Sequence, residues 1–230
     1  SVNSGSSDKM QRYISNCYSM GIEVISPSIN FSGIDFTIKK DQILFGLSAI
    51  KNLGDSAIRN IISNRKELGN FKSLSDLCDR LPSNVLNKRN LESLIHCGAL
   101  DEFSDNKNRA QLFSDLEYVM EWAASRNRDR ISGQGNLFDS IEKNSKGQFS
   151  QSQLSKVDDY SLIEKLKLEK QLLGFYLSDH PLKHLSKPAK LVSPVCISNL
   201  EETKDRTKVS LVAMIPELKQ ITTRKGDRMA

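Results

Sequence analysis

Leu47-Ser-Ala-Ile-Lys-Asn-Leu-Gly-Asp-Ser-Ala-Ile58 carries two short helical patterns that meet at a turn. The first pattern predicts a short helix over residues 47–51. The second starts with Ala57 and Ile58 and predicts a helix that ends at Gly69. Between them, Asn and Gly are residues that adopt the unusual backbone angles of a tight turn at low cost. We expect Leu53, the apolar residue of the turn, to pack between the two helices.

This stretch resembles the helix-hairpin-helix DNA-binding motif. In such a motif, unpaired N–H groups at the start of the second helix bind a DNA phosphate without reading the base. The predicted DNA-binding residues here are Lys51, Asn52, Leu53, Gly54, Ser56 and Arg59. Asn52 stands where the motif usually has Gly, and Asp55 would weaken phosphate binding unless it caps the helix. The alternative is an ordinary corner between two helices with no ligand.

A second hairpin is predicted over Asp76–Gly98. If Asn87 caps its second helix, Lys88 and Arg89 lie in the first turn, where cations oppose the helix dipole. A bound phosphate would remove that conflict, so both cations are predicted to bind DNA. The alternative is solvated surface charge.

Further helices are predicted from apolar spacing and caps, and the fold class is mostly α. The predicted ranges are 8–20, 74–81, 86–97, a longer helix from about 108, and 161–173. Ser6 or Ser7 is the predicted cap of the first of these helices. The stripe of the longer helix includes Leu112, Phe113 and Leu116. Short β elements are expected near the start, as a hairpin around residues 39–42. Alternation over residues 209–215 predicts a strand, and a hairpin turn is expected at 224–227.

Composition argues against a membrane-spanning protein and against a protein built on metal-binding or disulfide-bonded cysteines. The chain has 230 residues, 38% of them hydrophobic, a net charge of +5 and no apolar run long enough for a membrane span. Residues 39–130 hold 15 Lys and Arg against 13 Asp and Glu, so DNA binding there would depend on local geometry rather than charge. Four cysteines without metal-site spacing are expected to be free thiols in a reducing cytosol. We therefore expect no membrane partner.

The peptide Gln134-Gly-Asn-Leu-Phe138 follows the longest predicted helix and precedes a polar stretch. It resembles the Gln-x-x-Leu-Phe peptide by which bacterial replication proteins bind the beta sliding clamp. Gln134, Leu137 and Phe138 are the predicted clamp-binding residues. The alternative is that Leu137 and Phe138 fold back onto the preceding helix.

Several longer stretches resemble the alpha subunit of bacterial DNA polymerase III. They are Met10–Ile14, Met20–Val24, Gly46–Lys51, Leu91–Asp101, Leu173–Leu182 and Arg224–Ala230. The resemblance implies an internal fragment with five parts. These are the end of the fingers region (1–36), a tandem helix-hairpin-helix domain (37–130), the clamp-binding peptide and linker (131–160), a helical connector (161–194), and the start of a truncated β-barrel of OB type (195–230).

The resemblance also implies a cytoplasmic DNA-directed DNA polymerase, a nucleotidyltransferase whose partners are the duplex DNA backbone, the beta sliding clamp and other replicase subunits. Its magnesium ions would be held by aspartates upstream of this chain. No Asp-x-Asp cluster occurs here, so we assign no catalytic residue, metal ligand or cofactor, and expect the fragment to be inactive. Asp76 and Asp79 are expected to lie on a solvated helix face. The alternative is a non-polymerase DNA-binding or scaffold module of a repair protein.

Overall fold

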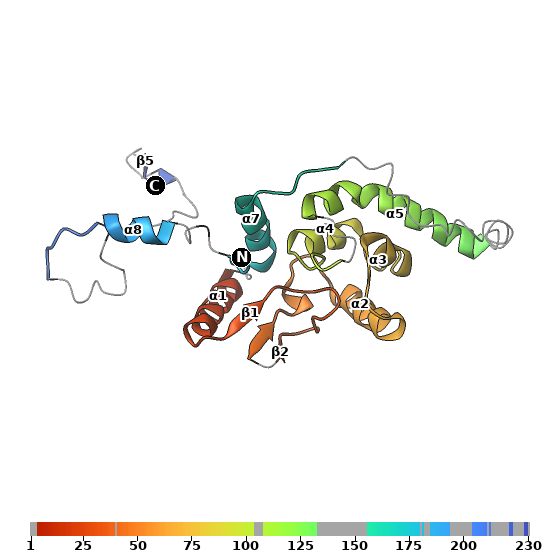
Figure 1. Cartoon of the computed structure of the whole chain (residues 1–230), viewed down its shortest axis with the longest axis horizontal. Helices are drawn as coiled ribbons and strands as arrows, with labels where there is room; N and C mark the ends of the chain where they lie inside the picture. Colours follow the sequence, from red (N-terminus) through yellow and green to blue (C-terminus); the bar gives the residue numbers. More distant parts are fainter. Residues whose placement is uncertain are drawn as a thin grey trace. The chain divides into compact units, whose positions relative to one another are not determined.

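The structure is a computed structural model, mostly helical, in which the chain forms two compact units, Ser1–Asp179 and His180–Ala230 (Figure 1). It describes residues 4–39, 41–103, 108–132, 156–179, 181, 185–193, 204–210, 212, 221–222 and 228–229. The prediction of a mostly helical chain with short β elements near its start is confirmed.

The first unit begins with a helix and a small sheet. α1 (Ser4–Ser19) ends before Gly21, whose φ of +74° suits glycine. Because the helix already starts at Ser4, the prediction that Ser6 or Ser7 caps it is wrong. The strands β1 (Glu23–Ile25), β2 (Thr37–Lys39) and β3 (Gln42–Leu44) form a sheet of order β1-β3-β2. β3 pairs parallel with β1 and antiparallel with β2, as the expected hairpin requires.

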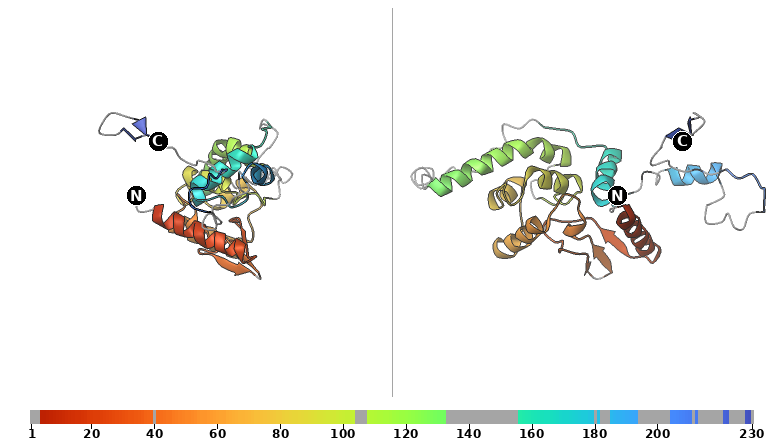
Figure 2. Two further views of the ribbon diagram at one scale, coloured as in Figure 1. Left: turned by 90° about the vertical axis from the view of Figure 1, so that its left-hand side faces the viewer. Right: turned by 180° about the vertical axis from the view of Figure 1, so that it is seen from behind.

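Helices form the rest of this unit (Figure 2). They are the 3₁₀ turn η1 (Leu47–Ala49), α2 (Asp55–Leu68), α3 (Leu74–Arg80), α4 (Lys88–His96), α5 (Arg109–Ser132) and α7 (Leu162–Leu173). Three of them begin at polar caps, because the side chains of Ser73, Asn87 and Ser161 accept hydrogen bonds from N–H groups of the following turn. The expected helix over residues 47–51 is only a single 3₁₀ turn, which is shorter than predicted.

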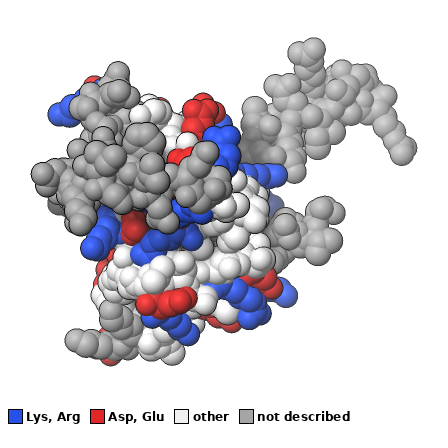
Figure 3. Space-filling view, turned by 90° about the vertical axis from the view of Figure 1, so that its right-hand side faces the viewer, with Lys and Arg blue, Asp and Glu red and all other residues white. Residues whose placement is uncertain are grey.

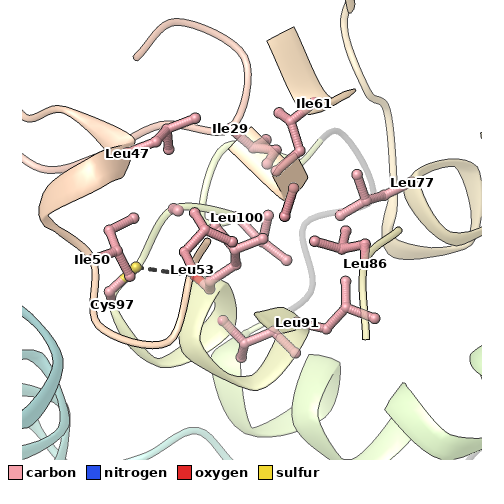
Figure 4. Close-up of a cluster of buried hydrophobic side chains, with 14 of the residues drawn as sticks. Ile29, Leu47, Ile50, Leu53, Ile61, Leu77, Leu86, Leu91, Cys97 and Leu100 are labelled. Carbon is pink, nitrogen blue, oxygen red and sulfur yellow. Dashed lines mark hydrogen bonds between the residues drawn. The ribbon is translucent and has the colours of Figure 1, made fainter. Parts of the chain in front are cut away.

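One hydrophobic core connects the sheet region to the helices. Figure 4 shows Leu53 of the turn among side chains from the loop after β1, from α2 to α4 and from the segment after α4. Leu53 is 7% exposed, which confirms that it packs inward. On α5, Leu112 and Leu116 are buried as predicted, but Phe113 is 39% exposed and is not part of the buried stripe.

The segment after α7 joins the same core. Phe175 and Leu177 are buried, and the ring of Phe175 lies 5.8 Å from the ring of Phe45, which follows β3. Residues 161–179 therefore pack with the helices that precede them in the chain.

The second unit contains α8 (Ser186–Val192) and two short antiparallel strands, β4 (Ile221–Thr222) and β5 (Arg228–Met229). These strands flank the expected turn at 224–227, which itself lies outside the described residues. Within the expected strand over 209–215, the structure describes residues 209, 210 and 212, and they are not in a strand. In the described part of the chain, no helix is long and apolar enough to span a membrane.

Candidate nucleic-acid interface

The turn between η1 and α2 depends on the backbone of Asn52. Asn52 has a φ of +67°, in the left-handed region that asparagine tolerates better than most residues other than glycine. Gly54 instead has φ −82° and ψ 157°, which any residue can adopt. A Cβ atom built on Gly54 would have no neighbour within 4 Å. The turn therefore needs a special conformation at Asn52, and Gly54 leaves open space at the surface.

Gly54 is also the residue that precedes α2, and no side chain caps this end of the helix. Asp55 is the first helical residue, but it does not act as the cap that would have reconciled it with a bound anion. Gly54, Asp55 and Ser56 are exposed, so the first N–H groups of α2 face solvent. The positive end of the helix dipole lies at the same point. The start of α2 therefore has the geometry and polarity of an anion site.

Two of the predicted cations lie near the start of α2, and their charges are not used in ion pairs with other residues that the structure describes. Lys51 and Arg59 are exposed and form no ion pair with any residue that the structure describes. By contrast, Arg65 donates to the carbonyl of Ile29 at 2.6 Å, and Arg80 donates to the carbonyl of Gly69 at 2.8 Å. Arg65 and Arg80 hold loops in place, so the cations on α2 and α3 are not equivalent.

On the face of the molecule that Figure 3 shows, charge is divided into small groups. Figure 3 shows Lys and Arg side chains in separate groups with Asp and Glu between them, rather than one continuous positive surface. The near balance of charge in residues 39–130 likewise predicts that DNA binding there depends on local geometry.

Hydrogen bonds with α4 and α7 fix the turn at Asn52. The side-chain amide of Asn90, on α4, donates to the carbonyl of Asn52 at 2.5 Å. The side-chain amide of Asn52 donates to the hydroxyl of Ser93 at 3.2 Å. On the other side, the backbone N–H of Lys51 donates to the carbonyl of Leu172 in α7 at 3.1 Å. The sequence pattern pointed to Asn52 but gave no signal for Asn90 or Ser93, because both lie in the second hairpin and their contacts with the first depend on tertiary packing.

In the second hairpin, Lys88 and Arg89 lie in the first turn of α4, as predicted. Unlike α2, this helix begins with a side-chain cap. Asn87 caps α4 by accepting from the N–H of Asn90, and the side chain of Asn90 accepts in return from the N–H of Asn87. Lys88 forms an exposed ion pair with Glu117 of α5, which raises the pKa of Lys88. Arg89 is exposed. The charge of Lys88 is thus matched by a carboxylate of this chain.

Comparison with known proteins shows which sequences this chain resembles. A sequence model of the helix-hairpin-helix motif matches residues 21–112, which include both hairpins. DNA polymerase III alpha subunits match the chain along its length. The subunit of Thermus aquaticus is 39% identical over 100% of this chain, that of Deinococcus radiodurans 37% over 97%, and that of Bacillus subtilis 33% over 98%. The chain is homologous to a segment of the DNA polymerase III alpha subunit.

The matched segment is a small part of these polymerase subunits. The chain spans 18% of the Thermus aquaticus protein, 17% of the Deinococcus radiodurans protein and 19% of the Bacillus subtilis protein. The sequence-based resemblance to the polymerase III alpha subunit is confirmed, and the helix-hairpin-helix match agrees with the predicted DNA-binding class.

The end of α5 leads toward the peptide that the resemblance identifies as clamp-binding. Gln134, Leu137 and Phe138 lie outside the described residues. Just before them, Arg126 and Arg130 of α5 bind Asp79 of α3, at 3.3 Å and 2.7 Å. The side chain of Asp79 is only 18% exposed, so the expectation that it lies on a solvated face is wrong. These two ion pairs join α3 to the last turns of α5.

A magnesium site of the kind used in nucleotide transfer needs several carboxylates that converge on the metal. No three His, Cys, Asp or Glu side chains in the described ranges converge as ligands of one metal ion. These residues therefore do not fit a magnesium site, and we derive no catalytic step from them.

Proposed function

We propose that this chain is the DNA-gripping and sliding-clamp-binding part of a bacterial replicative DNA polymerase. In this proposal the turn at residues 50–54 and the start of α2 bind a phosphate of duplex DNA. The observation that carries the proposal is the uncapped, exposed start of α2 behind the left-handed Asn52. Homology to polymerase III alpha subunits along the whole chain supports this function over that of a repair scaffold.

The chemistry favours contact with the DNA backbone rather than with bases. Backbone N–H groups donate equally well to a phosphate of any nucleotide, so they hold the duplex without reading its sequence. Lys51 and Arg59 would add charge beside the phosphate, and Ser56 a hydroxyl. Lys88 and Arg89 remain predicted contacts of the second hairpin. With so few cations, binding should be weak and should decrease steeply with salt.

The sharpest test uses Gly54→Ala. The new Cβ meets no heavy atom within 4 Å and suits the backbone angles, so the fold should persist at a cost of about 1 kcal/mol or less from the poorer cap. The same methyl group would occupy space that a phosphate needs. In fluorescence anisotropy titrations with a mixed-sequence duplex, we expect affinity to fall about tenfold, the loss of one charge-assisted hydrogen bond.

A charge-matched pair supplies the control. Arg59→Gln should weaken binding and reduce the slope of affinity against salt by about one phosphate contact. Lys9→Gln removes an equal charge from α1 and should leave that slope unchanged. If Gly54→Ala and Arg59→Gln both bind like the parent chain, the first hairpin does not bind DNA.

The clamp-binding role is proposed for Gln134, Leu137 and Phe138 on their sequence pattern. Leu and Phe side chains that enter apolar pockets of a partner contribute about 1.5–3 kcal/mol each when fully buried. Replacing Leu137 and Phe138 together by Ala should abolish binding to the beta sliding clamp in surface plasmon resonance, with unchanged melting of the chain. A loss of stability of about 2 kcal/mol or more would instead assign both residues to the core of this chain.

Nucleotide addition is proposed for the whole polymerase and not for this segment. In that polymerase, magnesium ions held by aspartates outside the present chain would support the reaction. Primer extension by the purified chain, with magnesium and nucleotides present, would contradict this assignment. The five-part division, the start of an OB-type barrel near residue 195, the other replicase subunits as partners and a cytoplasmic location are parts of the same proposal.

A further inference from the structure

We infer that Asn90, on the helix of the second hairpin, positions the DNA-binding turn of the first hairpin. In this arrangement the start of α4 supports the turn at Asn52 from within the protein. The inference rests on the proposed function, because it assigns a task to Asn90 only if that turn binds DNA.

The side chain of Asn90 uses both ends of its amide. Its oxygen accepts from the N–H of Asn87 at 3.0 Å, which completes the cap of α4. Its nitrogen donates to the carbonyl of Asn52 at 2.5 Å. Asn90 is 7% exposed, so little water competes for either bond. One buried side chain therefore fixes the start of α4 and the turn before α2 in the same geometry.

Asn52 needs such support because its left-handed conformation is costly for a residue with a Cβ atom. Asn90 holds its carbonyl and Ser93 holds its side chain, both from α4. Ser93 is 3% exposed. The direction in which α2 leaves the turn is thereby set before DNA arrives. Donors that are already oriented lose less entropy on binding than donors that must be ordered.

The start of α4 itself carries a side-chain cap. Asn87 and Asn90 use their N–H groups in the reciprocal cap, and Glu117 neutralises Lys88 next to them. At the start of α2 no side chain provides a corresponding cap. The two hairpins therefore differ in function although they follow one another in sequence. The first hairpin presents uncapped donors at the start of α2, and the start of α4 supports the turn that carries those donors.

A pair of isosteric substitutions tests this in the 230-residue chain. Asn90→Asp keeps the oxygen that accepts from Asn87 but places a second oxygen where the donor to Asn52 stood. Asn87→Asp adds the same charge to the same turn, and aspartate remains a good cap. We expect Asn90→Asp to lower affinity for a mixed-sequence duplex about tenfold, the effect of losing one part-buried hydrogen bond to the carbonyl of Asn52. Asn87→Asp should lower it about twofold, through charge alone.

A double-mutant cycle shows whether Asn90 acts through the turn. In a chain that already carries Gly54→Ala, the phosphate position is blocked, so Asn90→Asp should have little further effect on affinity. If the two losses are fully additive, or if Asn90→Asp and Asn87→Asp weaken binding equally, the inference is overturned.

A neutral variant covers the case in which Asn90→Asp fails to fold. Ser93→Ala removes the acceptor for the Asn52 side chain and should lower affinity about threefold, whereas Ser93→Ala in an Asn52→Gly chain should change nothing. Equal effects of Ser93→Ala in both chains overturn the inference. Failure of the proposed function has a different signature: the parent chain does not bind duplex DNA, or Gly54→Ala binds as the parent does.

Discussion

The guanidinium of Arg109 donates a 2.9 Å hydrogen bond to the carboxylate of Glu169, and the two side chains are only 7% and 2% exposed. This buried ion pair joins the first residue of α5 to α7. Arg109 also binds Asp101 at 2.6 Å and donates to the carbonyl of His96, while Glu169 accepts from the hydroxyl of Ser178 at 2.7 Å. Burial alone would lower the pKa of Arg109, but Asp101 and Glu169 outweigh it and raise that pKa. The arginine therefore stays charged inside the protein.

Removing one partner of this pair should be costly. Glu169→Ala leaves the buried guanidinium without one of its carboxylates and the Ser178 hydroxyl without its acceptor. We expect a loss of about 3–5 kcal/mol in the free energy of unfolding, measured by urea titration and circular dichroism. Glu117→Ala breaks the exposed pair with Lys88 and should leave the unfolding midpoint unchanged. Similar losses of unfolding free energy in both variants would show that burial of the ion pair does not determine how much its removal destabilises the chain.

Phe175→Ala tests whether the segment after α7 belongs to the common core. Phe175 is 3% exposed and contacts Phe45, so its truncation should cost about 3–5 kcal/mol of unfolding free energy. Ile163 of α7 is 71% exposed, and Ile163→Ala should be close to neutral in the same thermal or urea titration. A small effect of Phe175→Ala would mean that residues 161–179 are only loosely attached.

His96 should make stability depend on pH. It is half-buried and stacks on Phe113 with ring centres 4.8 Å apart. Burial lowers the pKa of His96, Glu92 opposes this, and Arg109 lowers it further. The unfolded chain therefore binds a proton, near its ordinary pKa of about 6.5, more readily than the folded chain. The contribution of neutral His96 to the free energy of unfolding should be fully present at neutral pH. It should be lost as the pH falls below the unfolded-state pKa of about 6.5 toward the lower folded-state pKa.

The matched variant for this test is His96→Phe, which keeps an aromatic ring against Phe113 and cannot be protonated. Melting temperatures of both chains, recorded from roughly pH 7 to pH 5, should diverge, with the parent losing more stability in acid. Parallel curves would mean that carboxylates alone cause the acid sensitivity.

The buried cysteines should be unreactive. Burial raises the pKa of Cys78 and Cys97 to about 12, and only the thiolate reacts with alkylating agents. Under native conditions near neutral pH, iodoacetamide should modify the partly exposed Cys17 well before Cys78 or Cys97, with peptide mass spectrometry as the measurement. In urea all three should react. Rapid native modification of Cys97 would indicate frequent local opening around α4.

Local patterns predicted most of the described helices. Leu91, Leu94 and Ile95 recur at helical spacing and are all buried on α4, and Gly98 ends that region with a φ of +83°. The turn at Asn52-Leu53-Gly54 was predicted for the same reason, because a turn residue and an apolar plug are recognisable within a few positions. The polymerase III alpha resemblance came from longer stretches of sequence and is confirmed by the relatives.

Other sequence-based expectations failed where side chains depend on distant elements. Asn52 and Gly54 were both expected to allow the unusual backbone angles of the turn, but only Asn52 adopts them. Phe113 followed the stripe of α5 yet is partly exposed beside His96, and Asp79 binds two arginines of α5. The clamp-binding peptide and the five-part division remain predictions.

By itself, the sequence determined the helical class, the position of the hairpin turn and the resemblance to DNA polymerase III alpha subunits. These depend on spacing, capping and turn residues, whose effects act over a few positions along the chain. Only the tertiary structure decided which polar groups are left for a ligand. Asn90 looks like any helix-start residue in sequence, and its bond to Asn52 exists because folding brings residues 38 positions apart together. Burial then makes that bond, and the Arg109–Glu169 pair, hard to replace by water.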